Sequence, residues 1–271
     1  MHEIIKYVNH LGEAIEFGKG DYFINYNDLR DYSWSYDSDN KIITNFTRAV
    51  STKSIPIIIC GKNNTALKNK LFEVFEKDVL TSQKGAFWIG DYYYRCYVVE
   101  SKKSNYLNTK GAATVSVTVV TDEPYWVTET SMIIKPVQNP GTGAKKYPYS
   151  YPYKYAGSGS YAVSNNTLSP VPFIMRIYGP CSDPDVMIGN QKYALNMTIN
   201  SGEYVTITAF EEQKTIVKTG VHGEKTNCFN YRDKTVNVFA PIPPGHFNIT
   251  WDNTFTFELI ICDRRSEPPW I

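Results

Sequence analysis

Only one stretch of this sequence has the periodicity of an amphipathic helix, and this limits what the chain can fold into. Thr65 can cap a helix that runs to about Leu80, because apolar residues follow it at helical spacing. These residues are Leu67, Leu71, Val74 and Phe75. The apolar run at 54–60 predicts a strand before the helix, and most of the remaining apolar runs are strand-like. We therefore expect a mostly β chain in which one helix covers one face of a sheet.

The residues around the helix predict paired strands. Two strand-like runs within residues 86–99 are broken at Gly90 and Asp91, which is typical of a β-hairpin. Residues 113–121 alternate between apolar and polar, as in an antiparallel sheet with one buried face. Pro56 cannot donate to a strand ladder, so the strand before the helix is expected to begin there or to lie at a sheet edge.

Shorter strands are predicted in the first fifty residues. Residues 32–36 alternate with aromatic side chains on one face, which predicts a strand that the polar residues 37–40 interrupt. Residues 42–50 predict the next strand, with either Ile43 or Phe46 facing the core, depending on register.

Composition predicts two domains. A chain of 271 residues is long enough for about two cores. We expect an N-terminal domain at 1–134, a Gly-, Pro- and Tyr-rich linker or arm at 135–170, and a C-terminal domain at 171–271. Alternating Tyr-Pro steps at 145–155 favour extended backbone, and both a flexible tether and an arm that lies against a surface stay open.

The C-terminal domain is predicted to contain strands and no helix, as in a β-sandwich or jelly roll. Turn residues at 189–191 and at 211–212 predict two hairpins. Residues 236–239 predict a further strand.

Charge argues against a protein whose main task is to bind nucleic acid or an anionic membrane, because the net charge is only +1. The charge is uneven, however. Residues 1–40 carry 3 basic and 8 acidic residues, whereas residues 41–110 carry 12 basic and 5 acidic residues. These segments could neutralise each other within one domain, or they could meet between copies of the chain, as in a ring.

No residue pattern points to catalysis, a metal or a cofactor. The five cysteines are widely spaced with no C-x-x-C motif, which predicts free thiols in a reducing compartment. The four histidines lack ligand spacing, and common hydrolase and nucleotide-binding motifs are absent. Asp183 and Asp185 flank a proline and predict a turn rather than a metal site. Neither a signal peptide nor a membrane-spanning run is predicted.

Several stretches together resemble one protein family. They are residues 66–80, 90–98, 115–127, 177–186, 225–232 and 266–271. Each motif is structural rather than chemical, but their order and their coverage extend over nearly the whole chain. The family is the distal tail proteins of siphophages that infect Gram-positive bacteria, together with related prophage tail components.

The resemblance implies an N-terminal antiparallel β-sandwich or split-barrel domain with one helix, and a C-terminal β-sandwich of the galectin or carbohydrate-binding-module type. It implies a non-enzymatic virion protein, made in the host bacterial cytoplasm, that forms a homohexameric ring at the baseplate hub. The implied partners are the tail tube protein, a tail-associated tip protein and a receptor-binding protein, with DNA in transit through the lumen and no membrane. The near-zero net charge suits such a lumen, since each phosphate contact would slow passage.

We expect part of the acidic N-terminal segment to face the lumen or a neighbouring subunit, together with aromatic and arginine residues. The predicted interface residues are Asp21, Asp28, Asp31, Asp37, Asp39, Trp34, Arg48, Trp88, Arg95 and Trp126. The alternative function is a carbohydrate-binding module that recognises host cell-wall polysaccharide. In that alternative Tyr231, Phe247 and Trp251 would stack on sugar rings, although aromatic residues at strand spacing also suit a core.

Overall fold

The computed structural model describes residues 4–24, 26–61, 64–105, 112–136, 161–211 and 213–270. The chain forms two compact units: unit 1 is Met1–Thr128 together with Arg264–Ile271, and unit 2 is Glu129–Asp263. The return of the last eight residues to unit 1 was not predicted. The predicted arm at 145–155 lies outside the described residues.

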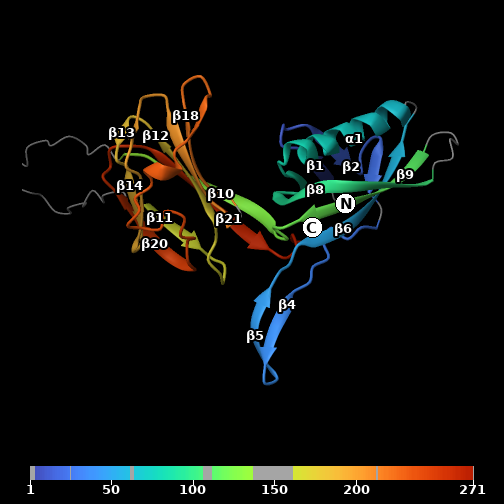
Figure 1. The fold of residues 1–271 in the computed structure, drawn as a ribbon, viewed down its shortest axis with the longest axis horizontal. Coiled ribbons are helices and arrows are strands. Elements are labelled where there is room, and N and C mark those ends of the chain that lie inside the picture. The colour runs from blue at the N-terminus through green and yellow to red at the C-terminus, as the bar shows by residue number, and fades with distance from the viewer. Residues whose placement is uncertain are drawn as a thin grey trace, which may run out of the picture. The chain divides into compact units, whose positions relative to one another are not determined.

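Unit 1 consists of antiparallel strands and one helix (Figure 1). Its elements are β1 (Ile5–Val8), β2 (Ala14–Phe17), β3 (Tyr22–Ile24), β4 (Ser35–Asp39), β5 (Ile42–Thr47), β6 (Ser51–Cys60), α1 (Asn64–Thr81), β7 (Gly85–Ile89), β8 (Tyr92–Asn105), β9 (Ala112–Thr121) and the start of β10 (Trp126–Ile134). Strands pair in the order β2-β1-β7-β8-β9-β6-β3, because β8 pairs with β7 through its first half and with β9 through its second.

The helix α1 covers one face of this sheet, as predicted (Figure 1). Leu71, Val74 and Phe75 are buried against the strands, and they belong to the core cluster of unit 1. The hairpin β7–β8 is also confirmed, with Ile89 opposite Tyr92 across the turn.

The prediction that Pro56 begins its strand or lies at an edge was wrong. Strand β6 begins at Ser51 and pairs with β9 along its whole length. On its other side β6 pairs with β3 only as far as Ile57, which lies opposite Ile24. Within the described residues, Pro56 lies just past the end of the pairing with β3, where its missing donor is tolerated.

Strand β4 occupies residues that were predicted to interrupt a strand. Asn40 and Lys41 form the turn to β5 with φ values of 46° and 69°. Both lie in the left-handed region that primed hairpin turns require, and Asn is among the residues that adopt it most readily. The expectation that Ile43 or Phe46 faces a core was also wrong, because both side chains are exposed.

Unit 2 contains two antiparallel sheets that enclose a common apolar core. One sheet has the order β19-β18-β17-β12-β21 and the other the order β11-β20-β14-β15, with a small β13–β16 ladder besides. Its elements are β11 (Tyr161–Asn165), β12 (Phe173–Tyr178), β13 (Cys181–Ser182), β14 (Asp185–Ile188), β15 (Gln191–Ala194), β16 (Thr198–Ile199), β17 (Tyr204–Ala209), β18 (Lys214–Thr219), β19 (Lys225–Asn227), the 3₁₀ turn η1 (Phe229–Tyr231), β20 (Gly245–Trp251) and β21 (Phe257–Arg265).

Both predicted hairpins of unit 2 are confirmed, as β14–β15 and β17–β18. The strand predicted at 236–239 was wrong: these residues form turns, although Val238 and Phe239 are buried. These two buried side chains are adjacent in sequence rather than alternating, so their burial does not indicate a strand.

Glu258 of β21 is expected to make the stability of unit 2 depend on pH in the acid range. Ser131 Oγ donates to its carboxylate at 2.6 Å and Arg176 Nη1 at 2.9 Å, and these bonds hold the pKa of Glu258 below its ordinary value of 4.5. A lowered pKa stabilises the fold above the ordinary value, and this stabilisation is lost as pH falls through the folded-state pKa.

We therefore expect the free energy of unfolding to fall more steeply below about pH 4.5 in the wild-type protein than in Glu258→Gln. Urea titrations at several pH values measure both slopes. Equal slopes in the two proteins would contradict this assignment.

Candidate assembly interface

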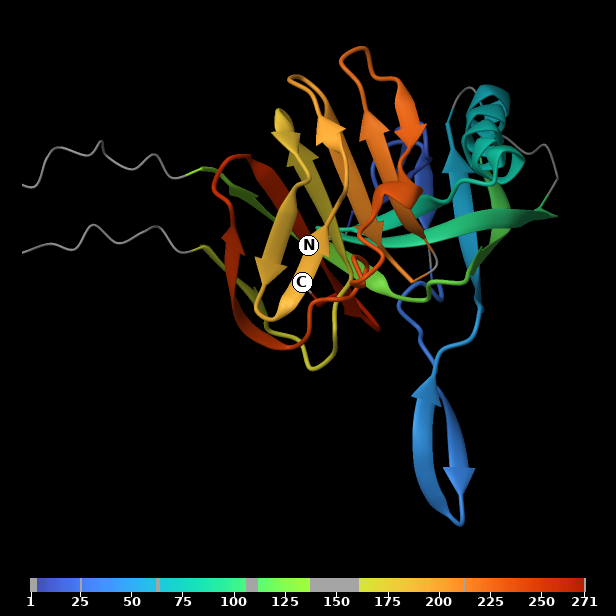
Figure 2. The ribbon, with the colours of Figure 1, turned by 60° about the vertical axis from the view of Figure 1, so that its left-hand side comes forward.

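The β4–β5 hairpin is the most exposed element of unit 1. Every described residue of both strands is exposed, and the hairpin extends away from the helix-covered sheet in both views (Figures 1 and 2). Tyr36 and Phe46 lie opposite each other across the hairpin and are 62% and 59% exposed. Large exposed apolar side chains continue along the hairpin and both of its flanks. Together they form what we call the apolar hairpin surface: Tyr32, Trp34, Tyr36, Ile42, Ile43, Phe46 and Val50.

This arrangement is unusual for a surface that faces only water. Monomeric proteins rarely expose contiguous apolar patches of this kind, and such patches commonly mark interaction sites. A two-stranded sheet without a covering layer is also marginally stable at best. The hairpin therefore has the features of an element that is completed by another molecule.

An aromatic cluster lies at the base of the hairpin. The guanidinium carbon of Arg48 is 4.7 Å from the ring centre of Tyr125, 5.2 Å from that of Trp34 and 5.9 Å from that of Tyr32. Trp34 and Arg48, both predicted interface residues, are therefore brought together.

The predicted acidic residues divide into two groups. Lys53 Nζ donates to the backbone oxygens of Asp28 and Asp31, and Ser54 N donates to the Asp28 carboxylate at 3.3 Å. Asp37 and Asp39 instead lie on the exposed hairpin. An ion pair between Lys77 and Glu13 at 2.8 Å balances part of the charge within unit 1, while the hairpin presents carboxylates outward. Asp21 is also exposed, next to Gly61.

The remaining predicted residues lie elsewhere. Trp88 and Arg95 flank Tyr93, with Trp88 5.0 Å and the Arg95 guanidinium 5.4 Å from its ring centre. Trp126 is fully buried and donates its indole N–H to Leu29 O at 3.3 Å. It is a core residue of unit 1 and lies outside the candidate surface.

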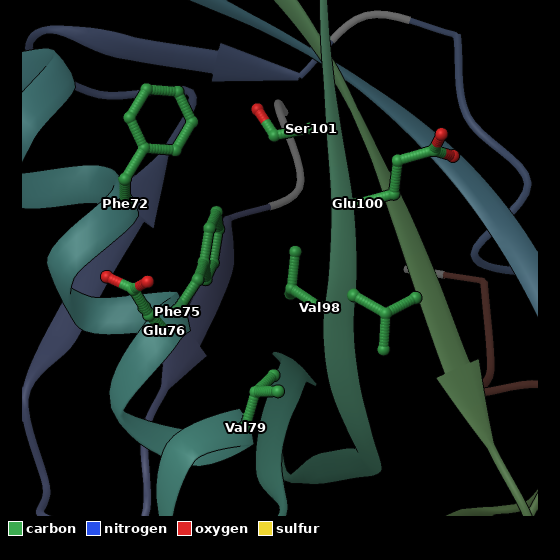
Figure 3. Close-up of a pocket in the computed structure, with 8 residues that line it drawn as sticks. Phe72, Phe75, Glu76, Val79, Val98, Glu100 and Ser101 are labelled. Carbon is green, nitrogen blue, oxygen red and sulfur yellow. The ribbon is translucent and has the colours of Figure 1, made fainter.

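An apolar groove runs between α1 and β8 (Figure 3). Its volume is about 280 Å³, and Phe72, Phe75 and Val79 of the helix face Val98 of the strand across it. Glu76 also lines the groove. Glu100 and Ser101 line it too, but Ser101 Oγ has no hydrogen-bond partner among the described residues, so no base is placed to activate it.

The most enclosed polar cluster of unit 1 is structural. Asp78 is fully buried and accepts bonds from Tyr7 OH at 2.5 Å and from His10 N at 2.9 Å, while His10 Nδ1 lies 2.5 Å from the same carboxylate. Burial, first of all, raises the pKa of Tyr7, which keeps its phenol protonated as a donor. These bonds tie α1 to the β1–β2 segment.

Among the described residues, no three or more His, Cys, Asp or Glu side chains are grouped so that they could hold a metal ion. Within the same part of the chain, no helix is long and apolar enough to cross a bilayer.

The three candidate sugar-stacking residues do not form one exposed platform. Tyr231 is half exposed in the η1 turn. Phe247 and Trp251 are partly buried against the core of unit 2, and Trp251 donates its indole N–H to Phe255 O at 3.1 Å.

Sequence reasoning missed Tyr36, Ile42, Phe46 and Val50 as surface residues of interest. The sequence feature that could have indicated this hairpin is the Asn40–Lys41 turn with apolar residues on both sides. These residues were instead predicted to end a strand, because no local feature distinguishes a half-buried hairpin from one that lacks a core.

Comparison with known proteins finds solved structures with a similar fold but no matching family by sequence. No family model matches the chain, and no curated protein matches it. Solved structures do match. A chain of the phage P2 baseplate in its activated conformation with calcium is 14% identical, with 99% of this chain and all of that chain covered and a TM-score of 0.69. The strontium form gives 0.70 at the same identity and coverage.

A third match is the crystal structure of SPP1 Dit, described as a paradigm of the hub adsorption apparatus in phages that infect Gram-positive bacteria. It is 8% identical, with 98% of this chain and all of that chain covered and a TM-score of 0.58. Over nearly its whole length, this chain has the fold of phage baseplate and Dit hub proteins.

Proposed function

We propose that this chain is a structural protein of a phage tail tip, a distal tail protein that forms a homohexameric ring at the baseplate hub. The fold supports the tail role. The observation that carries self-assembly is the apolar hairpin surface, which needs a covering partner. A second copy of the chain is the simplest partner. In a ring, each subunit places one surface against a different surface of the next subunit, so the hairpin of one copy could be covered by another part of its neighbour.

In this role the ring joins the tail tube protein to the tail-associated tip protein and to receptor-binding proteins, and DNA passes through its lumen. The protein resides in the virion after synthesis in the host cytoplasm. We assign it no catalytic residue, because the enclosed polar cluster around Asp78 is used to connect secondary-structure elements.

The test is the mass of the purified full chain by light scattering at several salt concentrations. We expect a mass of about six subunits, from a closed cyclic assembly. The mass should fall as salt rises if Asp37 and Asp39 meet basic residues of a neighbour, because salt screens exposed charge pairs beyond about 10 Å at 0.1 M. A monomer at every salt and protein concentration would contradict self-assembly of the isolated chain.

A further inference from the structure

The β4–β5 hairpin has one apolar face. In an antiparallel pair, residues directly opposite each other point to the same face, and side chains alternate between the two faces along each strand. Tyr36 lies opposite Phe46, and Ser38, two residues further along β4, lies opposite Ile43. The side chains of Tyr36, Ile43 and Phe46 therefore share one face of the hairpin, and each is more than half exposed.

Nothing in the described part of unit 1 covers this apolar face. Strands β4 and β5 form a two-stranded sheet of their own, and the hairpin extends away from α1 and the strands beneath it in both views (Figures 1 and 2). The groove between α1 and β8 is therefore out of reach of the hairpin of the same copy. It is open to the hairpin of a second copy.

The groove between α1 and β8 is an apolar hollow of matching character (Figure 3). Five of its eight lining residues are apolar, and of these Val79 and Val99 are 41% and 50% exposed. Its volume of about 280 Å³ lies just below the range of about 300–1,000 Å³ for pockets that hold drug-sized ligands. The groove therefore suits one or two side chains of a protein partner better than a small molecule.

Charged side chains at the groove and on the hairpin have opposite signs available. Glu76 lines the groove and is exposed, while Lys103 Nζ lies 4.7 Å from the ring centre of Phe72, another lining residue. The hairpin carries Asp39 and Lys41 next to its turn. Among the described residues, none of these four charges takes part in an ion pair. Both charges of the hairpin can thus meet an opposite charge at the rim of the groove.

We propose that the groove between α1 and β8 receives the apolar face of the β4–β5 hairpin from a neighbouring copy. Large aromatic side chains seated in an apolar hollow, with charged residues at the rim, are typical of the centre of a protein interface. A ring needs two different surfaces on each copy, and the groove supplies the second one. This inference rests on the proposed function and deepens it by naming the surface that the hairpin contacts.

Photo-crosslinking of the assembled full chain reads this contact directly. A benzophenone-bearing amino acid replaces Phe46, and crosslinked peptides are identified by mass spectrometry in a mixture of isotope-labelled and unlabelled copies. The mixture separates crosslinks between copies from those within one copy. We expect crosslinks between copies to reach residues 72–79 or 98–101, which line the groove. Crosslinks between copies that reach only other segments would overturn the groove as the receiving surface and leave assembly itself intact.

Two neighbouring substitutions on α1 test the groove independently. Val79→Lys should weaken each contact between copies about a hundredfold or more, because the hairpin would have to bury an unpaired charge. Leu80→Lys is the matched control: Leu80 is also exposed, but it is not among the residues that line the groove. We expect this control to change the contact by about threefold or less.

Light scattering over a dilution series measures assembly of both variants, and urea denaturation checks that both stay folded. If Val79→Lys assembles as well as Leu80→Lys, the groove is not the receiving surface, although the ring still forms. A wild-type protein that is monomeric at every concentration would instead overturn self-assembly together with this contact. The two failures are therefore distinguishable.

Discussion

Replacing Tyr36 and Phe46 together by serine should convert the assembled protein to monomers while both units stay folded. The two side chains form a cross-strand pair in the middle of the apolar hairpin surface, and neither contributes to a buried core. Burying one large apolar side chain contributes about 2 kcal/mol, so each contact between subunits should lose about 4 kcal/mol. That weakens each contact by about a thousandfold.

The effect on a ring is larger than the effect on one contact, because every subunit makes two contacts with its neighbours. Light scattering at fixed protein concentration measures the change in mass, and circular dichroism checks that the strands persist. The matched control is Leu11→Ser with Tyr26→Ser, which removes two exposed apolar side chains of unit 1 that are not among the residues of the apolar hairpin surface. If the variant with both Tyr36→Ser and Phe46→Ser assembles as well as this control, the hairpin is not part of the interface.

Asp78→Ala should lower the free energy of unfolding of unit 1 by about 3–5 kcal/mol, the range for breaking a buried charged network. The change removes the acceptor of the buried Tyr7 hydroxyl and of the partly buried His10 N–H, and it leaves both donors without that partner. The Asp78 network is also tightly packed. A Cβ atom added at Gly85 would lie 2.2 Å from Asp78 Oδ2 and 2.3 Å from Tyr7 Oη.

Urea denaturation of the full chain, followed separately in each unit by amide exchange, measures this loss. Glu76→Ala is the control on the same helix, since Glu76 is exposed and should change stability by about 0.5 kcal/mol or less. Similar losses for the two variants would show that the Asp78 network contributes little.

The local spacing of apolar residues was sufficient to predict those helices and strands that bury one face against a core. The stripe that contains Leu71 and Phe75 predicted α1, and the Gly90–Asp91 turn predicted the β7–β8 hairpin, because burial imposes the helical or alternating period in each case. The resemblance to distal tail proteins, drawn from motif order, agrees with the fold matches over nearly the whole chain.

The local sequence pattern did not predict the structure correctly where a residue's environment depends on residues distant in sequence. Trp126 looked like a surface aromatic, but it is buried against Leu29, almost one hundred residues away. The β4–β5 hairpin has no core face, so neither register of Ile43 and Phe46 could be correct. A small polar cavity is lined by residues from both flanks of that hairpin, including Ser33 and Arg48, together with Pro124, and no local spacing predicts that these residues meet.

The return of the chain to unit 1 has a consequence for synthesis on the ribosome. Unit 2 is one continuous segment, so it can fold as soon as Asp263 has left the exit tunnel. Unit 1 is completed only afterwards, when Arg30 can donate to Pro268 O at 2.7 Å and lie against the Trp270 ring at 4.1 Å. The hairpin-bearing unit thus reaches its final form later than unit 2, and a finished assembly surface appears only after residues 264–270 have emerged.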